Sequence, residues 1–396
     1  MRVQNDILRG IDSHKDVVLI LLDLSAAFDT VNHQILLQRL SDHFGICNTA
    51  LDWFTSYLTD RKQCVAIGER ISASHTLDCG VPQGSVFGPL EFTLYTAPVE
   101  NIIESHGVES MMYADDSQIY LVMETSNRAT QLTKLEDCVR DVKAWTVANK
   151  LLLNDSKTEV VHFTSRFLRQ LIPITSLTIG LSEVHVSEKA RNLGVLMDKH
   201  MTLSTHINNV CRSASFAISK IGQIRRFIDQ ATAERLVHAF VTSRLDANNS
   251  LLYGLPKTAI AKLQRVQNSA IRLVTCVKRD QDIQSVRRNL HWLPIRDRIV
   301  FKLLLITYKI RHGFAPEYLA DLVTDYTPAR TLRSTSQYLL QPPSRREVAT
   351  AYYGKRAFSI SAPSLWNKLP LAIRNANSVN SFKRQLKTHL FNNPSD

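Results

Sequence analysis

The stretch Tyr113-Ala114-Asp115-Asp116 places two adjacent carboxylates between two largely apolar runs of residues. Two such runs joined by a short polar tip are typical of an antiparallel hairpin. Because side chains alternate across a strand, only one carboxylate of the pair has to point toward any given face. An ordinary polar turn, in which Asp is a favoured residue, is the alternative interpretation of this stretch by itself.

Another carboxylate lies upstream, at the end of a continuous apolar run. Residues 17–22 are all apolar and are followed by Asp23, so they predict a buried strand that ends in a charge. A carboxylate there costs free energy unless a cation compensates it, or unless it lies beyond the strand in water. Between Asp23 and the hairpin lies a loop rich in chain-breaking residues, residues 80–84.

Hydrophobic spacing predicts helices and strands around these segments. The predicted strands are residues 17–24, 63–67, 109–114, 118–123, 160–163, 177–179 and 193–196. The predicted helices are residues 26–44, 51–58, 89–103, 129–145, 203–228, 231–245, 257–277 and 295–312. The sequence therefore predicts an α+β fold, in which an antiparallel sheet with helices on one face is followed by an all-helical region.

Carboxylates on neighbouring strands suit phosphoryl transfer by two metal ions. Two Mg²⁺ ions about 3.5–4 Å apart activate the attacking oxygen and stabilise the leaving one. Mg²⁺ prefers hard oxygen ligands and is usually held by one or two carboxylates together with substrate phosphates. Asp23 and the Asp115-Asp116 pair therefore form a candidate metal site, provided that the strand end and the hairpin tip meet.

The same segments, in the same order, resemble the successive motifs of reverse transcriptases, most closely those of non-LTR (LINE-type) retrotransposons and especially of CR1/L2-like elements. The matching segments are Asp23–Asp29, Gly80–Ser85 with Gly88–Leu90, Tyr113–Asp116, Leu153–Glu159 and Leu193–Asp198. The closing stretch 357–391 also resembles the end of the second open reading frame of these elements. The resemblance implies a polymerase palm followed by a thumb-like region. It also implies RNA-directed DNA polymerisation with an RNA template, a DNA primer and deoxynucleoside triphosphates.

Roles for the charged residues follow from this resemblance, position by position. Asp23 and Asp115 would bind two Mg²⁺ ions, Asp116 would assist them, and the Leu24 carbonyl would add a ligand. Lys157 would neutralise or protonate the leaving pyrophosphate, and the alternative is that it is a solvated lysine.

Three further positions would contact substrates. Phe28 would lie under the sugar of the incoming nucleotide and disfavour a 2′-hydroxyl, unless it is simply a core residue. Gln83 and Gly84 would line the nucleotide and template pocket, where glycine lets the backbone approach a substrate closely. Asp29 is instead expected to favour the start of a helix through the helix dipole.

Charge is unevenly distributed along the chain, whose formal net charge is +12. Residues 1–254 hold 24 Lys and Arg against 28 Asp and Glu, and residues 255–396 hold 24 against 8, so the balances are −4 and +16. On and just after the predicted helix 257–277, basic residues follow one stripe. The stripe indicates contacts with nucleic-acid phosphates, or else a solvated face. It consists of Lys262, Arg265, Arg272 and Arg279.

The resemblance divides the chain into three expected regions. These are a palm over residues 1–200, a helical thumb and connection over 201–330, and a basic C-terminal region over 331–396. Only 22 residues precede Asp23, where the family carries a fingers region. We therefore expect an N-terminally truncated copy with impaired activity.

Two residues of the second motif depart from the family pattern. Phe87 and Glu91 stand where the related motif carries aliphatic residues. A carboxylate at position 91 would destabilise the fold if it were buried without a partner.

Other classes of protein remain as alternatives. The first is a non-catalytic nucleic-acid-binding remnant. The second is another palm nucleotidyltransferase, such as a cyclase, against which the loop at Gln83 and the segment at Lys157 argue. The six cysteines show no Cys-x-x-Cys spacing, which argues against a zinc site or a disulfide framework. No apolar run is long enough to span a membrane and no secretion signal is present, so we expect an intracellular protein. The oligomeric state stays open.

Overall fold

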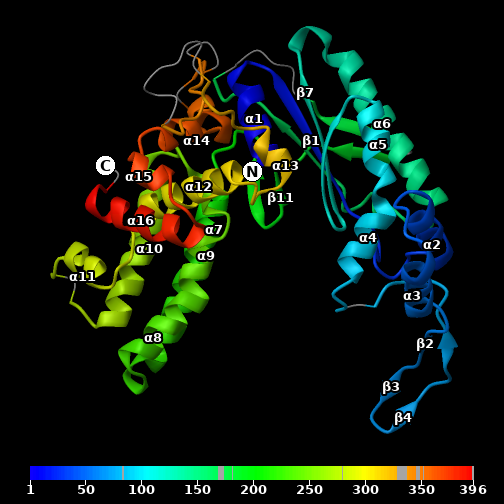
Figure 1. Ribbon diagram of the computed structural model, residues 1–396, viewed down its shortest axis with the longest axis horizontal. Helices are drawn as coiled ribbons and strands as arrows, with labels where there is room; N and C mark the ends of the chain where they lie inside the picture. Colours follow the sequence, from blue (N-terminus) through cyan, green and yellow to red (C-terminus); the bar gives the residue numbers. More distant parts are fainter. Residues whose placement is uncertain are drawn as a thin grey trace. The chain divides into compact units, whose positions relative to one another are not determined.

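The computed structural model describes residues 1–82, 84–167, 174–180, 182–278, 280–327, 337–344, 348–350 and 352–394. Two compact units make up the chain (Figure 1). The sheet unit comprises Lys15–Leu193, and the helical unit comprises Met1–His14 together with Gly194–Asp396.

A four-stranded antiparallel sheet with the strand order β6-β7-β1-β8 forms the centre of the sheet unit. Its strands are β1 (Asp16–Leu22), β6 (Glu109–Tyr113), β7 (Asp116–Met123) and β8 (Glu159–Phe163). The helices of the unit are α2 (His33–Asp42), α3 (Asn48–Leu58), α4 (Gly88–Thr96), α5 (Pro98–Ser105) and α6 (Arg128–Ala148). The shorter strands are β2 (Lys62–Gln63), β3 (Ala66–Ile67), β4 (Arg70–Ile71), β5 (His75–Thr76), β9 (Ser176–Ile179), β10 (Ser182–His185) and β11 (Lys189–Asn192).

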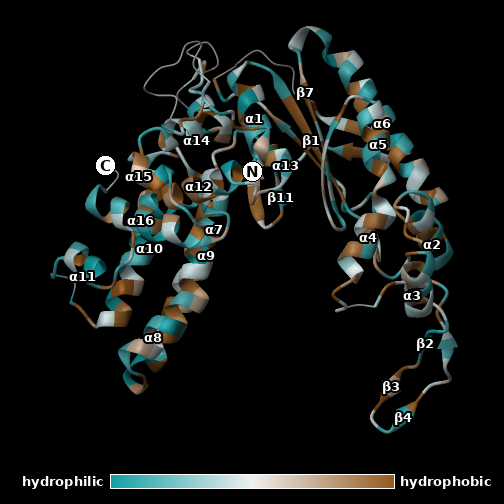
Figure 2. Cartoon of the chain, viewed as in Figure 1, coloured by the Kyte–Doolittle hydropathy of each residue, from teal (hydrophilic) through white to brown (hydrophobic). Residues whose placement is uncertain are grey.

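Helices α5 and α6 cover one face of this sheet. Alternate residues of β1, namely Val18, Ile20 and Leu22, pack in one core with residues of both helices. Figure 2 shows β1 and β7 as largely hydrophobic, as expected for central strands that are buried on both faces. The predicted antiparallel sheet with helices on one face is therefore confirmed.

Two helices of the sheet unit differ from the sequence prediction. The helix predicted over 26–44 begins only at His33, because the Asn32 side chain accepts a hydrogen bond from the Ile35 amide and caps it. The helix predicted over 89–103 is divided into α4 and α5. Pro98 lacks an amide hydrogen and so cannot continue a helix, but it is tolerated as the first residue of the next one.

The helical unit consists almost entirely of helices. The longer ones are α1 (Arg2–Asp12), α7 (Ser204–Ile224), α8 (Gln230–Val237), α10 (Lys257–Thr275), α12 (Ile295–Arg311), α14 (Phe358–Trp366) and α16 (Val379–Asn392). The shorter elements are β12 (Val195–Asp198), α9 (Ser243–Asp246), α11 (Ile283–Asn289), α13 (Glu317–Ala320) and α15 (Leu371–Arg374). Residues of α12, α14, α15 and α16 share one apolar core. Among the helices of the described residues, none combines the length and apolar composition that crossing a bilayer requires.

Glu91 in the first turn of α4 is fully buried. Neither of its carboxylate oxygens has a hydrogen-bond partner within the described residues. Burial raises the pKa of this carboxyl, and the charge of Arg61 opposes the shift. An uncompensated carboxylate in this position destabilises the sheet unit at neutral pH.

Replacing Glu91 with leucine is therefore expected to stabilise the protein by about 1–3 kcal/mol at pH 7. The pKa is raised in the folded state, so the penalty is complete above the folded pKa and fades as the pH falls toward the ordinary carboxyl range. Urea unfolding of both proteins at a series of pH values measures this difference. The exposed Glu100 provides the control, since Glu100→Leu should give no such gain. A Glu91→Leu protein that is less stable at neutral pH would contradict the assignment.

Candidate functional site

The end of β1 lies beside the start of β7. Strand pairing sets Leu22 opposite Ser117, and one further step of the same register brings Asp23 beside Asp116. Residues opposite each other in antiparallel strands point to the same face, with Cβ atoms about 4.5–5.5 Å apart. The strand end and the hairpin tip therefore meet at one end of the sheet.

Lys157 lies on the other side of Asp23. Strand β8 pairs with β1 so that Leu21 lies opposite Glu159, two residues after Lys157. The Nζ atom of Lys157 is 3.4 Å from Oδ2 of Asp23. The backbone holds this arrangement, because the Asp23 carbonyl accepts a hydrogen bond of 2.8 Å from the Asn154 amide. Asp23 thus sits between a carboxylate and an ammonium group.

These side chains occupy the face of the sheet turned away from α5 and α6. Leu22 and Ile119 belong to the core under those helices. Because side chains alternate along a strand, Asp23 and Asp116 point to the opposite face. The two carboxylates therefore lie at one end of that opposite face, whose more central residues, such as Leu19 and Tyr120, are apolar and buried.

Asp115 and Asp116 follow a left-handed residue at the hairpin tip. Ala114 has a φ of 53°, a conformation that L-residues other than glycine seldom adopt and that functional sites often hold. Strand β7 begins at Asp116, so the tip is Ala114-Asp115 rather than the predicted Asp115-Asp116. Both carboxylates are exposed.

Asp23, Asp115 and Asp116 place three carboxylates at the same end of the sheet. We call these three residues the acidic site. The pKa of Asp116 is raised by partial desolvation and then by the charges of Asp115 and Asp23. A carboxylate whose pKa is raised by neighbouring negative charges favours the binding of a cation beside it. The charges of Asp115 and Asp23 therefore act on the carboxyl group of Asp116.

The donor set of the acidic site suits a hard divalent cation. Oδ2 of Asp23 is buried and accepts no hydrogen bond within the described residues, and its one charged neighbour there is the exposed Lys157 ammonium at 3.4 Å, which a cation could displace. No group of three or more His, Cys, Asp or Glu in the described parts of the chain is arranged as a ready metal site. An ion here would complete its coordination with water and phosphate oxygens, as Mg²⁺ commonly does.

The glycine-containing loop lies against the segment that follows Asp23. The Val81 amide donates to the Phe28 carbonyl at 2.8 Å, and the Gly80 amide donates to the Val31 carbonyl at 2.8 Å. Gly80 has a φ of 89°, and a Cβ there would lie 3.0 Å from the Asp29 carbonyl oxygen. Only glycine therefore permits this contact.

The predicted substrate residues are placed as follows. The half-buried Phe28 packs its ring against Phe92, with centroids 5.2 Å apart, so it has a core contact as well as the predicted role. Gly84 is exposed and has a φ of 81°. Gln83 lies outside the described residues. Leu24 forms a bridge to Leu153, which keeps its backbone next to the segment that carries Lys157.

The predicted basic stripe lies on α10. Lys262 donates to the Asn208 side chain of α7 at 2.9 Å, Arg265 is exposed, and the Nε atom of Arg272 is buried without a hydrogen-bond partner within the described residues. Arg279 lies outside the described residues. The opposite face of α10 is buried, which agrees with its predicted apolar face.

Comparison with known proteins identifies the family of the sheet unit. Residues 4–197 match the family described as reverse transcriptase (RNA-dependent DNA polymerase). A probable RNA-directed DNA polymerase from transposon BS of Drosophila melanogaster is 26% identical over 292 residues, which make up 69% of this chain and 30% of that protein. The corresponding protein of the transposon X-element, from the same organism, is 30% identical over 218 residues, or 53% of this chain and 22% of that protein. This chain thus spans less than a third of the length of either relative.

Among solved structures, telomerase from Candida albicans, in complex with a fragment of telomeric RNA, is similar at a TM-score of 0.34. The sequence identity is 12%, over 76% of this chain and 50% of that chain.

Proposed function

Since this chain carries a reverse transcriptase domain of the non-LTR retrotransposon family, we propose that its acidic site polymerises DNA on an RNA template. The substrates would be a DNA primer and deoxynucleoside triphosphates. The observation that carries the proposal is the position of Asp23, between the carboxylate of Asp116 and the ammonium group of Lys157.

The acidic site would hold two Mg²⁺ ions. Asp23 and Asp115 would bind both ions, Asp116 would assist, and the Leu24 carbonyl would complete the set. The ions, when bound, would activate the primer 3′-hydroxyl and stabilise the leaving oxygen. Oδ2 of Asp23, which accepts no hydrogen bond within the described residues, and the charges of Asp115 and Asp23 that act on Asp116 support this assignment.

Residues around the acidic site would position the substrates. Lys157, 3.4 Å from Asp23, would neutralise or protonate the leaving pyrophosphate. Phe28 would present the part of its ring not packed on Phe92 to the sugar and so disfavour a 2′-hydroxyl. Gln83 and Gly84 would line the nucleotide and template pocket, and the hydrogen bond from Val81 to Phe28 would keep that loop beside the sugar.

The helical unit would hold the nucleic acid. Basic residues of α10 would contact phosphates in a manner that is independent of sequence and sensitive to salt. We assign residues 201–330 to a thumb and connection, and residues 331–396 to a basic C-terminal region. The balance of +16 over residues 255–396 supports this assignment.

Primer extension by the purified chain tests the proposed function. We expect slow, Mg²⁺-dependent incorporation of deoxynucleotides that follows the sequence of an RNA template, with ribonucleotides used less well. Incorporation that ignores the template would contradict the proposal. Tight binding of the primer–template without any extension would instead favour the non-catalytic remnant.

A further inference from the structure

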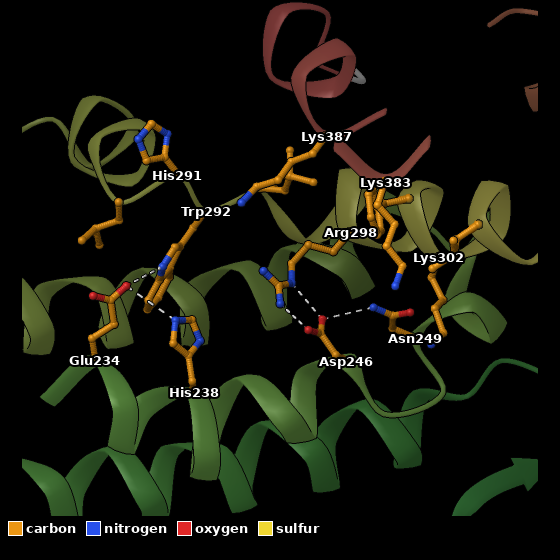
Figure 3. A pocket seen from close by; sticks show the side chains of 14 residues that line it. Glu234, His238, Asp246, Asn249, His291, Trp292, Arg298, Lys302, Lys383 and Lys387 are labelled. Carbon is orange, nitrogen blue, oxygen red and sulfur yellow. Dashed lines mark hydrogen bonds and ion pairs between the residues drawn. The ribbon is translucent and has the colours of Figure 1, made fainter. Parts of the chain in front are cut away.

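A pocket of about 560 Å³ opens among the helices of the helical unit, away from the acidic site in sequence (Figure 3). Residues from α8, α9, the segment 290–293, α12 and α16 line it. Its volume falls within the roughly 300–1,000 Å³ of typical ligand sites. No sequence motif pointed to this pocket.

Three lysines give the pocket its positive charge. Lys302 comes from α12, and Lys383 and Lys387 come from successive turns of α16. Figure 3 shows Lys383 and Lys302 extending toward the side of the pocket where Asn249 lies, and Lys387 extending toward Trp292. None of the three has an ion-pair partner among the described residues, although Lys387 also lies over the Phe391 ring.

The two acidic residues of the pocket are already engaged. Asp246 forms a two-point ion pair with Arg298, so these charges cancel. Glu234 accepts a hydrogen bond of 3.2 Å from Nε1 of Trp292 and lies 3.5 Å from His238. The three lysines, all of them exposed, therefore retain their positive charge, which favours an anionic ligand.

Asn249 presents an unused hydrogen-bond acceptor in the same pocket. The residue is 4% exposed, and its Nδ2 donates to Asp246 at 3.2 Å. A carboxylate can only accept, so the amide orientation is fixed and the Asn249 oxygen points elsewhere. That buried oxygen has no hydrogen-bond partner within the described residues. A ligand with a donor group would satisfy it.

The remaining wall is apolar and aromatic. Trp292, Phe301 and Leu305 contribute to it. The Trp292 ring is held in place by its bond to Glu234 and by the His238 ring, whose centroid is 5.0 Å away. Trp292 is 5% exposed, so the wall offers an apolar and aromatic surface of which Trp292 is only a part, and beside lysines it suits a ligand that has both an apolar body and an anionic group.

We propose that this pocket binds one nucleotide unit of a single-stranded nucleic acid. The phosphate contacts Lys302, Lys383 and Lys387, the base or sugar packs against the wall that includes Trp292, and a hydroxyl or amino group donates to Asn249. A nucleotide unit combines these three chemistries, whereas a bare anion supplies only the first. The pocket thus binds a single-stranded nucleic acid, and it does so with residues other than those of the acidic site.

The test compares two triple variants of the full chain. K302Q/K383Q/K387Q removes the three exposed lysines of the pocket, and K220Q/K278Q/K368Q removes the same charge from equally exposed positions of the same unit that do not line the pocket. Binding of a labelled single-stranded RNA is followed by fluorescence anisotropy at several salt concentrations. We expect the pocket variant to bind roughly tenfold more weakly, with a log–log salt slope flattened by about 2 for three lost contacts. The control variant should change affinity by less than about threefold.

Competition identifies the ligand class. Adenosine monophosphate should displace the RNA from the pocket more effectively than inorganic phosphate, because only the nucleotide has a planar body. Equal losses in the two triple variants would overturn the proposal. So would equal competition by phosphate, or by poly-glutamate, which would assign the pocket to anions in general or to acidic polypeptides. These readouts measure binding alone, so the proposal can fail or hold whether or not the chain polymerises.

Discussion

Replacing Asp23 with asparagine should lower the rate of RNA-templated primer extension by on the order of 10³-fold while leaving the fold intact. Asparagine keeps the size of the side chain and removes its charge. Asp23 lies between Asp116 and Lys157, so loss of its charge leaves the Lys157 ammonium uncompensated at the place where cations should bind. Single-turnover extension rates measure the effect.

Asp52 offers a matched control for this substitution. It is exposed on α3, and Asp52→Asn should leave extension unchanged. A second readout does not depend on activity. Because the charge of Asp23 helps to raise the pKa of Asp116, that pKa should fall in the Asp23→Asn protein and can be followed by carbon NMR titration. Full activity in Asp23→Asn, or an unchanged Asp116 titration, would remove Asp23 from the acidic site.

The central sheet could be predicted from the sequence because its signals are local. Residues 17–22 form an unbroken apolar run, and the hairpin is marked by two apolar arms around a polar tip. The end of that strand and the tip of that hairpin are the places where the acidic site lies. Helix ends were less predictable, because the cap at Asn32 decides where α2 begins and hydrophobic spacing alone does not show it.

The pocket of the helical unit could not be predicted from the sequence, because its formation depends on tertiary packing. Its residues come from segments as far apart as Glu234 and Lys387, and none of these segments carries a motif that would mark it as part of a binding site. Asn249 is an example of a pocket residue that the sequence does not reveal. Only the structure shows that its amide is buried with one side bonded and the other free of partners within the described residues.

Helix α1 was missed for a related reason. Its buried side combines the apolar Ile7 and Leu8 with the polar Gln4, Asn5 and Asp12, which interrupt the hydrophobic pattern. In the structure each polar residue has a distant backbone partner. Gln4 donates to the Leu251 carbonyl, and Asn5 accepts from the Ser359 amide. Helix α1 therefore attaches to the later part of the helical unit through specific hydrogen bonds as well as apolar packing.

Asp12 makes the most of these bonds and should be the most sensitive residue of α1. It is 1% exposed and accepts from the amides of Ala349, Thr350 and Gly354 at 2.9, 2.8 and 3.0 Å. The Thr350 hydroxyl adds a fourth bond at 2.5 Å. Asp12→Ala would leave these donors buried without an acceptor, and we expect it to destabilise the helical unit by about 3–5 kcal/mol.

Urea unfolding measures this loss, and hydrogen exchange of the α1 amides shows whether it is local to the helical unit. Asp6→Ala serves as the control, because the half-buried Asp6 pairs with Arg2 on the same helix and accepts fewer hydrogen bonds than Asp12, so its loss should cost clearly less than that of Asp12. Gly354→Ala tests the same junction from the other side, since a Cβ at this position would collide with the Asp12 carboxylate. It should therefore speed exchange in α1 as Asp12→Ala does. If both substitutions leave α1 as protected as in the wild type, the hydrogen bonds of Asp12 do not hold this helix, and its apolar side chains alone must do so.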